Sequence, residues 1–254
     1  MMIQKIREII QDADMVLIGI GEEFEAEKLL NHMDEYTKLR TTSEAAGNEW
    51  LIPALNHNFA LNKIKEALSH LAEIIKDKNY FLVTVTTNDV VWNCGFKEGR
   101  IVAPCGGSLK KQCSNPKCEF SPVALTEEDS MSLCNWIQSG DSEKISLGIC
   151  PECGATMILN NIYSEHYNEQ GYLDQWSLYT KWLQGTLNRK LCILELGVGM
   201  QCPSVIRFPF EKIGYFNQKA TFIRVNANLY QLTEELKGKG ISISENAVDF
   251  IASV

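Results

Sequence analysis

The chain has 254 residues, of which 45% are hydrophobic and 22% are charged, and this composition is typical of a globular protein with a substantial core. Its formal net charge of -8 disfavours a large nucleic-acid surface, because phosphate contacts require clustered Lys and Arg and the pair Lys110 and Lys111 is too short to supply them. The apolar runs are far shorter than a membrane span and the first residues do not resemble a secretion signal, so we expect a cytoplasmic protein that binds no membrane.

The first ninety residues alternate between helical and extended patterns. Residues 1–14 are amphipathic, MVLIGI at 15–20 is a buried strand that enters a glycine turn, and residues 25–36 are predicted to continue as a helix. A second helix is predicted over 62–78, because apolar residues recur there at three- and four-residue spacing, and a strand is predicted over 80–89. This order indicates β-turn-α units.

Two more strands are predicted over 190–199 and 220–229. Buried strands separated by helical patterns favour an α/β fold, in which a Rossmann-like parallel sheet carries helices on both faces. Ligands of such sheets bind at the carboxyl ends of the strands. The glycines and polar residues at these ends are therefore expected to line one crevice: Gly19, Gly21, Thr87, Asn88, Gly197, Gly199, Asn226 and Asn228.

Residues from about 105 to 160 interrupt this alternation, because they are rich in Pro, Gly and Ser and contain two close cysteine pairs. We predict a Rossmann-like domain formed by residues 1–104 and 160–254, with an inserted zinc-binding module over 105–159. Cys113 and Cys118 enclose four residues and Cys150 and Cys153 enclose two, which is a spacing typical of a structural Zn²⁺ site with four thiolates. A redox pair at Cys150 and Cys153 is the weaker alternative.

The other cysteines have no partner at ligand spacing. Cys134 and Cys192 are predicted to be small buried hydrophobic residues, since free cysteine is among the most buried residue types. Nine cysteines in a cytoplasmic chain indicate metal ligands, buried residues or a reactive thiol in preference to a disulfide framework.

The order of these motifs resembles the sirtuins, the NAD-dependent protein deacylases and ADP-ribosyltransferases. The resemblance covers nearly the whole chain and rests on GIGEE at 19–23, TTND at 86–89, PCGGSL at 104–109, CPEC at 150–153, ELGVGMQCPSVIRFPFEK at 195–212 and VNANL at 225–229. The long stretch at 195–212 is similar to the macrodomain-linked sirtuins of microbes. That branch is associated with ADP-ribosylation of lipoyl-carrier proteins, so the resemblance implies NAD as cofactor and a protein acceptor, with a lipoyl-carrier protein as the expected kind.

The resemblance also implies roles for the residues at the strand ends. Gly19 and Gly21 would face the NAD pyrophosphate, and Asn226 would contact the adenosine ribose. Asn88 and Asp89 would lie near nicotinamide. The segment Gly197, Val198 and Gly199 would line the same pocket. Two alternatives stay open: GIG is also a common turn, and Asn226 also suits a strand cap.

Two departures from the family pattern bear on activity. Glutamates follow the glycine turn and would repel the charge of a bound pyrophosphate. The catalytic His that precedes Gly in deacylases is absent, and Cys105 or Gly106 stands in its place, while His32, His57, His70 and His166 lie elsewhere. Deacetylation therefore lacks its general base, and we expect ADP-ribosyl transfer.

Cys105 is a candidate nucleophile or substitute base, although a small residue without chemical consequence also fits this position. The alternative function is an inactive sirtuin-like module that recognises ADP-ribose or a protein partner.

Overall fold

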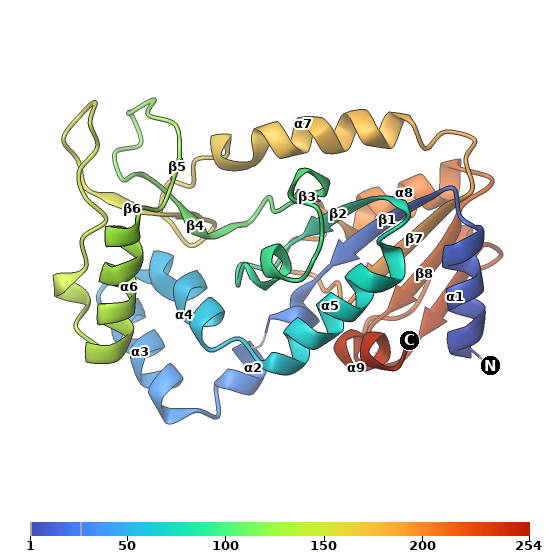
Figure 1. Cartoon of the computed structure of the whole chain (residues 1–254), viewed down its shortest axis with the longest axis horizontal. Coiled ribbons are helices and arrows are strands. Elements are labelled where there is room, and N and C mark those ends of the chain that lie inside the picture. The colour runs from blue at the N-terminus through green and yellow to red at the C-terminus, as the bar shows by residue number, and fades with distance from the viewer. Residues whose placement is uncertain (1, 26) are drawn as a thin grey trace.

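A computed structural model of the chain describes residues 2–25 and 27–254, and its centre is a six-stranded parallel sheet (Figure 1). Strands follow the order β3 (Ile101–Val102), β2 (Asn79–Thr84), β1 (Met15–Ile20), β7 (Leu191–Leu196), β8 (Thr221–Val225) and β9 (Gly240–Ile243). Each pair of neighbours is parallel. The α/β class predicted from the sequence is confirmed.

The order of the strands reverses beside β1. The chain runs outward from β1 through β2 to β3 on one side, and from β7 through β8 to β9 on the other. Loops that leave β1 and β7 therefore diverge to opposite sides of the sheet, and such a switch point opens a crevice at the carboxyl ends of the strands. β1 and β7 are in register from Met15 opposite Leu191 to Ile20 opposite Leu196, so their glycine-containing ends lie side by side.

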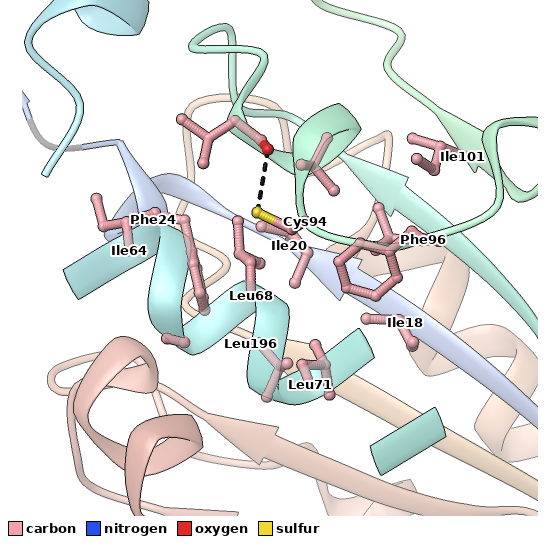
Figure 2. Packing of buried hydrophobic residues seen from close by; sticks show 14 of the residues in the cluster. Ile18, Ile20, Phe24, Ile64, Leu68, Leu71, Cys94, Phe96, Ile101 and Leu196 are labelled. Atoms are coloured by element: carbon pink, nitrogen blue, oxygen red, sulfur yellow. Dashed lines mark hydrogen bonds between the residues drawn. The ribbon is translucent and has the colours of Figure 1, made fainter. Parts of the chain in front are cut away.

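Helices cover both faces because alternate residues of each buried strand point to opposite sides. Val16, Ile18 and Ile20 belong to the core beneath α1 (Met2–Asp12), α5 (Asn62–Ile75) and α9 (Ala247–Ser253). Figure 2 shows Ile18 and Ile20 near Leu68 and Leu71 of α5. On the opposite face, Leu17 belongs to the core beneath α7 (Gln170–Gln184) and α8 (Arg207–Phe216).

A smaller lobe lies beside the sheet. It contains an antiparallel sheet in the order β5 (Val123–Ala124), β4 (Gly106–Cys113) and β6 (Met157–Asn161), together with α6 (Glu127–Ser139). Thr126 and Asp129 form a capping box at the start of α6, and Gly140 ends it in the left-handed conformation. Helices α3 (Asp34–Ala45) and α4 (Ile52–Asn58) lie beside these elements in Figure 1. The division into residues 105–159 and the remainder stays a prediction.

Two local predictions differ from the structure. The helix predicted over 25–36 is interrupted: a single 3₁₀ turn at Glu22–Phe24 precedes α2 (Glu27–Leu30), and α3 begins only at Asp34; residue 26 lies outside the described residues. Asp34 and Glu35 favour a new helix start there, because acids stabilise the first turn. Cys192 is buried as predicted, but Cys134 is exposed on α6, so that prediction was wrong.

No helix within the described residues has both the length and the apolar character that crossing a membrane requires.

Candidate functional site

The glycine turns of β1 and β7 meet at the switch point. A Cβ atom on Gly21 would lie 2.3 Å from the Cα of Val198, and a Cβ on Gly19 would lie 2.5 Å from the Ile206 side chain. Gly197 has a positive φ of 63°, a conformation that favours glycine. Gly21 therefore lets the two loops pack backbone against backbone, whereas Gly19 and Gly197 leave room for the side chains of Ile206 and Glu23.

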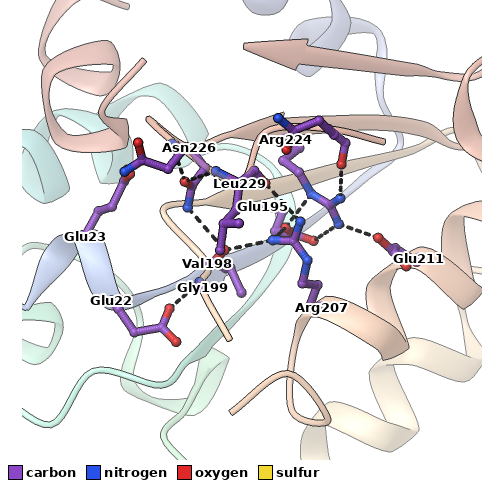
Figure 3. Close-up of polar contacts among 12 residues, drawn as sticks. Glu22, Glu23, Glu195, Val198, Gly199, Arg207, Glu211, Arg224, Asn226 and Leu229 are labelled. Carbon is purple, nitrogen blue, oxygen red and sulfur yellow. Dashed lines mark hydrogen bonds and ion pairs between the residues drawn. The ribbon is translucent and has the colours of Figure 1, made fainter. Parts of the chain in front are cut away.

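The two glutamates that follow the glycine turn fill this crevice from within. One carboxylate oxygen of Glu22 accepts a hydrogen bond from the backbone N–H of Gly199, and the other accepts one from Gln201 at 3.0 Å. Glu23 divides its oxygens in the same way, accepting from Ala227 at 2.8 Å and from Ala247 at 2.7 Å. Figure 3 shows the contact of Glu22 with Gly199. Each carboxylate thus bridges two backbone donors of the surrounding loops.

A third glutamate contacts the loop after β2 through one carboxylate oxygen only. Glu25 accepts hydrogen bonds from both the backbone N–H and the hydroxyl of Thr87, just beyond β2. Its second oxygen, Oε2, is buried and has no hydrogen-bond partner. Burial raises the pKa of Glu25 to about 7 against the opposing hydrogen bonds from Thr87, so this side chain is protonated in part at neutral pH.

This arrangement does not fit a bound dinucleotide. Backbone N–H groups at strand ends are the donors that hold phosphates in such folds, and here those of Gly199 and Ala227 already donate to carboxylates. The cavity that remains beside Glu22, Glu25, Glu27 and Cys202 measures about 80 Å³. Pockets for drug-sized ligands measure roughly 300–1,000 Å³. In the described conformation, the protein's own carboxylates take the place that pyrophosphate oxygens would need.

Asn226 secures the adjacent loop. Its Oδ1 accepts hydrogen bonds from the backbone N–H groups of Asn228 at 2.9 Å and Leu229 at 2.7 Å, while its Nδ2 donates to the carbonyl of Val198 at 3.2 Å. Arg207 ties the same two loops by donating to the carbonyls of Val198 and Leu229. In this conformation Asn226 therefore makes the contacts expected of a residue that caps the end of a strand.

Beneath these loops lies an ion-pair network that the sequence analysis missed. The guanidinium of Arg224 contacts both carboxylate oxygens of Glu195 at 2.6 and 2.9 Å and also pairs with Glu211 (Figure 3). Arg224 and Glu195 are 1% and 0% exposed as side chains. Burial raises the pKa of Glu195, and Arg224 opposes that rise. The sequence signal for this network is an acid, Glu195, and a base, Arg224, in opposite positions of the adjacent strands β7 and β8.

Asn88 and Asp89 lie where β2 approaches the smaller lobe. The Nδ2 of Asn88 donates to the carbonyl of Phe24 at 2.7 Å, and Nδ1 of His57 lies 2.7 Å from the Asn88 carbonyl. Asp89 has a positive φ of 56° and accepts from the backbone N–H and hydroxyl of Ser108 on β4. Burial raises the pKa of Asp89. These two residues join the β1 loop, the β2 loop and the smaller lobe.

A second cavity, of about 200 Å³, opens between the lobes next to this joint. Its lining includes Asp89 and Trp92, together with Tyr167, which precedes α7, and Tyr172 of α7. Cys105 lies at the entrance to the smaller lobe and is buried, with its thiol 3.7 Å from that of Cys202. This pair could not be predicted from cysteine spacing, because 96 residues lie between Cys105 and Cys202.

The two cysteine pairs of the smaller lobe converge. The Sγ atoms of Cys113, Cys118, Cys150 and Cys153 all lie within 4.8 Å of one another, and the contacts between the pairs include 3.4 Å from Cys113 to Cys153 and 3.6 Å from Cys118 to Cys150. Zn–S bonds of about 2.3 Å in a tetrahedron place sulfurs roughly 3.8 Å apart. Gly154 adopts a positive φ of 73° directly after the last cysteine. The cluster therefore fits a tetrahedral ion.

Comparison with known proteins relates this chain to enzymes of ADP-ribosyl chemistry. No family model matches it. Its sequence is 19% identical to a protein ADP-ribosyltransferase of Staphylococcus aureus (strain Mu50), over 98% of this chain and 85% of that protein. It is 27% identical to a probable bifunctional ADP-ribose hydrolase/ADP-ribosyltransferase of Fusarium oxysporum f. sp. cubense, over 47% of this chain and 21% of that much longer protein.

The solved structures decide the fold. Sir2Tm bound to a propionylated peptide aligns over 100% of this chain and 97% of its own, with a TM-score of 0.58 at 10% identity. A Sir2 complex with a p53 peptide and NAD⁺ aligns over the same shares, with a TM-score of 0.58 at 11% identity. This chain has the sirtuin fold. The resemblance stated from the motifs is confirmed at that level.

The sirtuin-like chain brings most of the predicted site residues to one edge of the sheet. The glycines after β1 and β7, Val198 and Asn226 lie around the crevice, whereas Gly19 lies within β1 and packs against Ile206 and Phe210. Asn88 and Asp89 lie at the joint between the lobes, and the four metal-binding candidates form a separate cluster. The glutamates at 22, 23 and 25 were visible in the sequence as acids after a glycine turn. Only the structure shows that they occupy the backbone donors.

Proposed function

We propose that this sirtuin-like chain transfers the ADP-ribosyl group of NAD to a protein acceptor, and that the described conformation is its closed state. The carrying observation is the intact frame of the crevice: Gly21, Gly197 and Asn226 meet at the switch point of a fold whose solved relative holds NAD. The similarity to a protein ADP-ribosyltransferase along 98% of the chain supports the same choice.

Deacylation is disfavoured by the residue at the entrance to β4. The motif pattern puts Cys105 or Gly106 where deacylases carry their catalytic His, and neither is a matched base: Gly106 has no side chain, and the neighbouring Cys202 raises the pKa of the Cys105 thiol, with burial adding to the rise. A thiol held in its neutral form is a poor general base. Nearby, His57 directs Nδ1 at the Asn88 carbonyl and comes from α4, not from the loop before β4.

The transferase proposal requires a second conformation. NAD cannot enter until Glu22 and Glu23 release the donors that they now hold, so an open state must lose four backbone-to-carboxylate hydrogen bonds and regain them, or their equivalents, from the ligand. The acceptor is expected to be a protein, and a lipoyl-carrier protein is the kind that the macrodomain-linked branch suggests. Sir2 structures that hold peptides support a protein acceptor.

The same glutamates favour a second candidate, an inactive module that binds a protein partner. If the carboxylates never leave the crevice, they act as permanent internal replacements for phosphate. The cavity of about 200 Å³ between the lobes would then be the remaining place for a partner's side chain.

Two measurements on the same proteins separate these candidates. Calorimetric titration with NAD and with ADP-ribose is compared between the wild type and a Glu22→Gln/Glu23→Gln variant, with Glu235→Gln/Glu245→Gln, which removes two exposed acids, as the charge-matched control. Nicotinamide release is then assayed with candidate acceptors. The transferase predicts binding that strengthens in the double variant and release that depends on the acceptor. A folded double variant that binds neither ligand would eliminate the transferase and leave the binding module.

We also propose that the four-cysteine cluster binds Zn²⁺ as a structural site. All four positions are supplied by protein thiolates, which leaves no open position for substrate. The ion would hold the long connections on either side of α6 together, in a lobe too small to gain much stability from its core alone.

A further inference from the structure

Two cysteines that belong to neither the metal cluster nor the carboxylate contacts meet at the back of the crevice. The thiols of Cys105 and Cys202 lie 3.7 Å apart, and they come from loops that follow β3 and β7. A disulfide needs about 2.05 Å between the sulfurs, and rotation of the side chains can close much of the difference. The pair is thus at contact distance without any rearrangement of the fold.

The two thiols are not equivalent. Cys105 is 2% exposed, whereas Cys202 is partly exposed and lines the small cavity beside Glu22 and Gln201. The Cys105 thiol donates to the Cys202 sulfur and lowers the pKa of Cys202 to about 7, although burial and Glu22 act in the opposite direction. One sulfur is therefore reachable and ionised in part, and the other is protected behind it. Redox-active pairs divide attack and resolution in this way.

We propose that Cys105 and Cys202 form a redox-active dithiol that a hydroperoxide oxidises to an intramolecular disulfide. The Cys202 thiolate attacks the peroxide O–O bond, gaining an S–O bond and releasing hydroxide. The sulfur of Cys105 then attacks the sulfenic sulfur, an S–S bond replaces the S–O bond, and the proton of Cys105 leaves with the hydroxyl as water. Two thiols and one H₂O₂ give one disulfide and two waters.

Hydrogen peroxide fits the setting better than a larger oxidant. The cavity in front of Cys202 measures about 80 Å³, which admits a few small molecules and excludes a peptide disulfide such as oxidised glutathione from in-line attack. Acidic side chains at Glu22, Glu25 and Glu27 would also repel an anionic disulfide. This inference is independent of the proposed transfer reaction, because it needs only the two loops.

The disulfide would act on the crevice itself. Cys202 directly follows Gln201, whose backbone N–H is held by Glu22 at 3.0 Å. A bond from Cys202 to Cys105 would tether this segment to the loop after β3, directly beside the contact that closes the crevice. The redox state of the pair is thereby linked to the carboxylate contacts.

The test uses the full-length, zinc-loaded protein and hydrogen peroxide at one equivalent, followed by denaturation, alkylation of free thiols and peptide mapping. We expect one linkage, between the peptides of Cys105 and Cys202, that dithiothreitol reverses, while the exposed Cys134 stays alkylated. A Cys134→Ser variant is the matched control and should form the same linkage. A Cys202 that oxidises while Cys105 remains free, or a faster loss of Cys134, would overturn the proposal.

Two further variants, Cys105→Ser and Cys105→Ala, test the pairing without requiring the disulfide to form. In Cys105→Ser, Cys202 has no resolving partner and should accumulate sulfinic acid. Cys105→Ala also removes the hydrogen-bond donor, so the pKa of Cys202 returns toward the ordinary 9.0 from about 7, and its thiolate fraction at pH 7 falls about 50-fold. The greater nucleophilicity of the more basic thiolate offsets roughly eight-fold of that loss, which leaves alkylation about six-fold slower. An unchanged alkylation rate would refute the pairing.

Discussion

Replacing Glu23 by Gln should destabilise the protein, because one side chain holds two loops together. In the wild type, Oε1 accepts from Ala227 and Oε2 accepts from Ala247, at 2.8 and 2.7 Å. Glutamine has the same shape, but its NH₂ group would face one of these N–H donors, so one charge-assisted hydrogen bond is lost. Such a bond contributes about 1.5–3 kcal/mol.

A smaller contribution comes from α9. Ala247 is the first residue of this helix, where a negative charge is favourable by roughly 0.5 kcal/mol. Glu23 is half-buried, so water replaces part of the lost interaction, and the expected cost is about 2 kcal/mol. For a chain of this length, 1 kcal/mol corresponds to roughly 2–4 °C, which predicts a fall in Tm of about 4–8 °C.

The assay is urea unfolding followed by circular dichroism, with thermal unfolding as a second measure. Glu245→Gln provides the control, since it removes the same charge from an exposed position two residues before Ala247. We expect the control to remain within about 0.5 kcal/mol of the wild type, as surface substitutions usually do. If Glu23→Gln matches the control, the carboxylate does not hold the β8 and α9 loops and the account of a closed crevice is wrong.

Three other outcomes follow from the contacts. Cys150→Ser should lose the metal and lower Tm, whereas Cys134→Ser should do neither; elemental analysis and thermal unfolding check both, and metal content unaffected by Cys150→Ser would exclude a four-thiolate site. Arg224→Met should lower the free energy of unfolding in urea by about 3–5 kcal/mol at pH 8, because Glu195 is left buried without its partner. The loss should be smaller at pH 5, where the Glu195 carboxyl can protonate. An equal loss at both pH values would contradict the pairing. Glu25 has a folded-state pKa of about 7 against an ordinary 4.5, so its contribution to the free energy of unfolding is fully present below pH 4.5 and is lost as pH rises to about 7. Glu25→Gln should therefore make the free energy of unfolding less dependent on pH over that interval. An unchanged pH dependence would show that Glu25 is not the group responsible.

The sheet was predictable because its strands are marked by local pattern. MVLIGI and the stretch at 190–199 are largely apolar and lead into glycine turns, and β1 and β7 fall within those bounds. β3 and β9 escaped prediction because they have two and four residues and receive their register from neighbouring strands. The hydrophobic pattern of a sequence indicates which residues are buried, whereas the pairing of a short edge strand depends on the strand that lies beside it.

The position of the site was predictable from the sequence, but the hydrogen bonds that its side chains make were not. The spacing of the four cysteines predicted a metal-binding cluster, since closely spaced thiols have few other common uses. The pairing of Cys105 with Cys202 depends on two loops that are distant in sequence and joined only by the strand order. Acids after the glycine turn suggested poor phosphate binding, but their individual donors depend on side-chain directions that the sequence does not specify.

The tight joint at Gly21 has a consequence for how such chains are recognised. A Cβ there would overlap the Val198 backbone whether or not any nucleotide is present, so the requirement for glycine comes from the meeting of two loops. A lineage could abandon its cofactor entirely and still be unable to change this residue. The glycine motif would then persist in proteins that no longer bind a nucleotide. The residues that directly follow the motif would be the better indicator of what occupies the crevice.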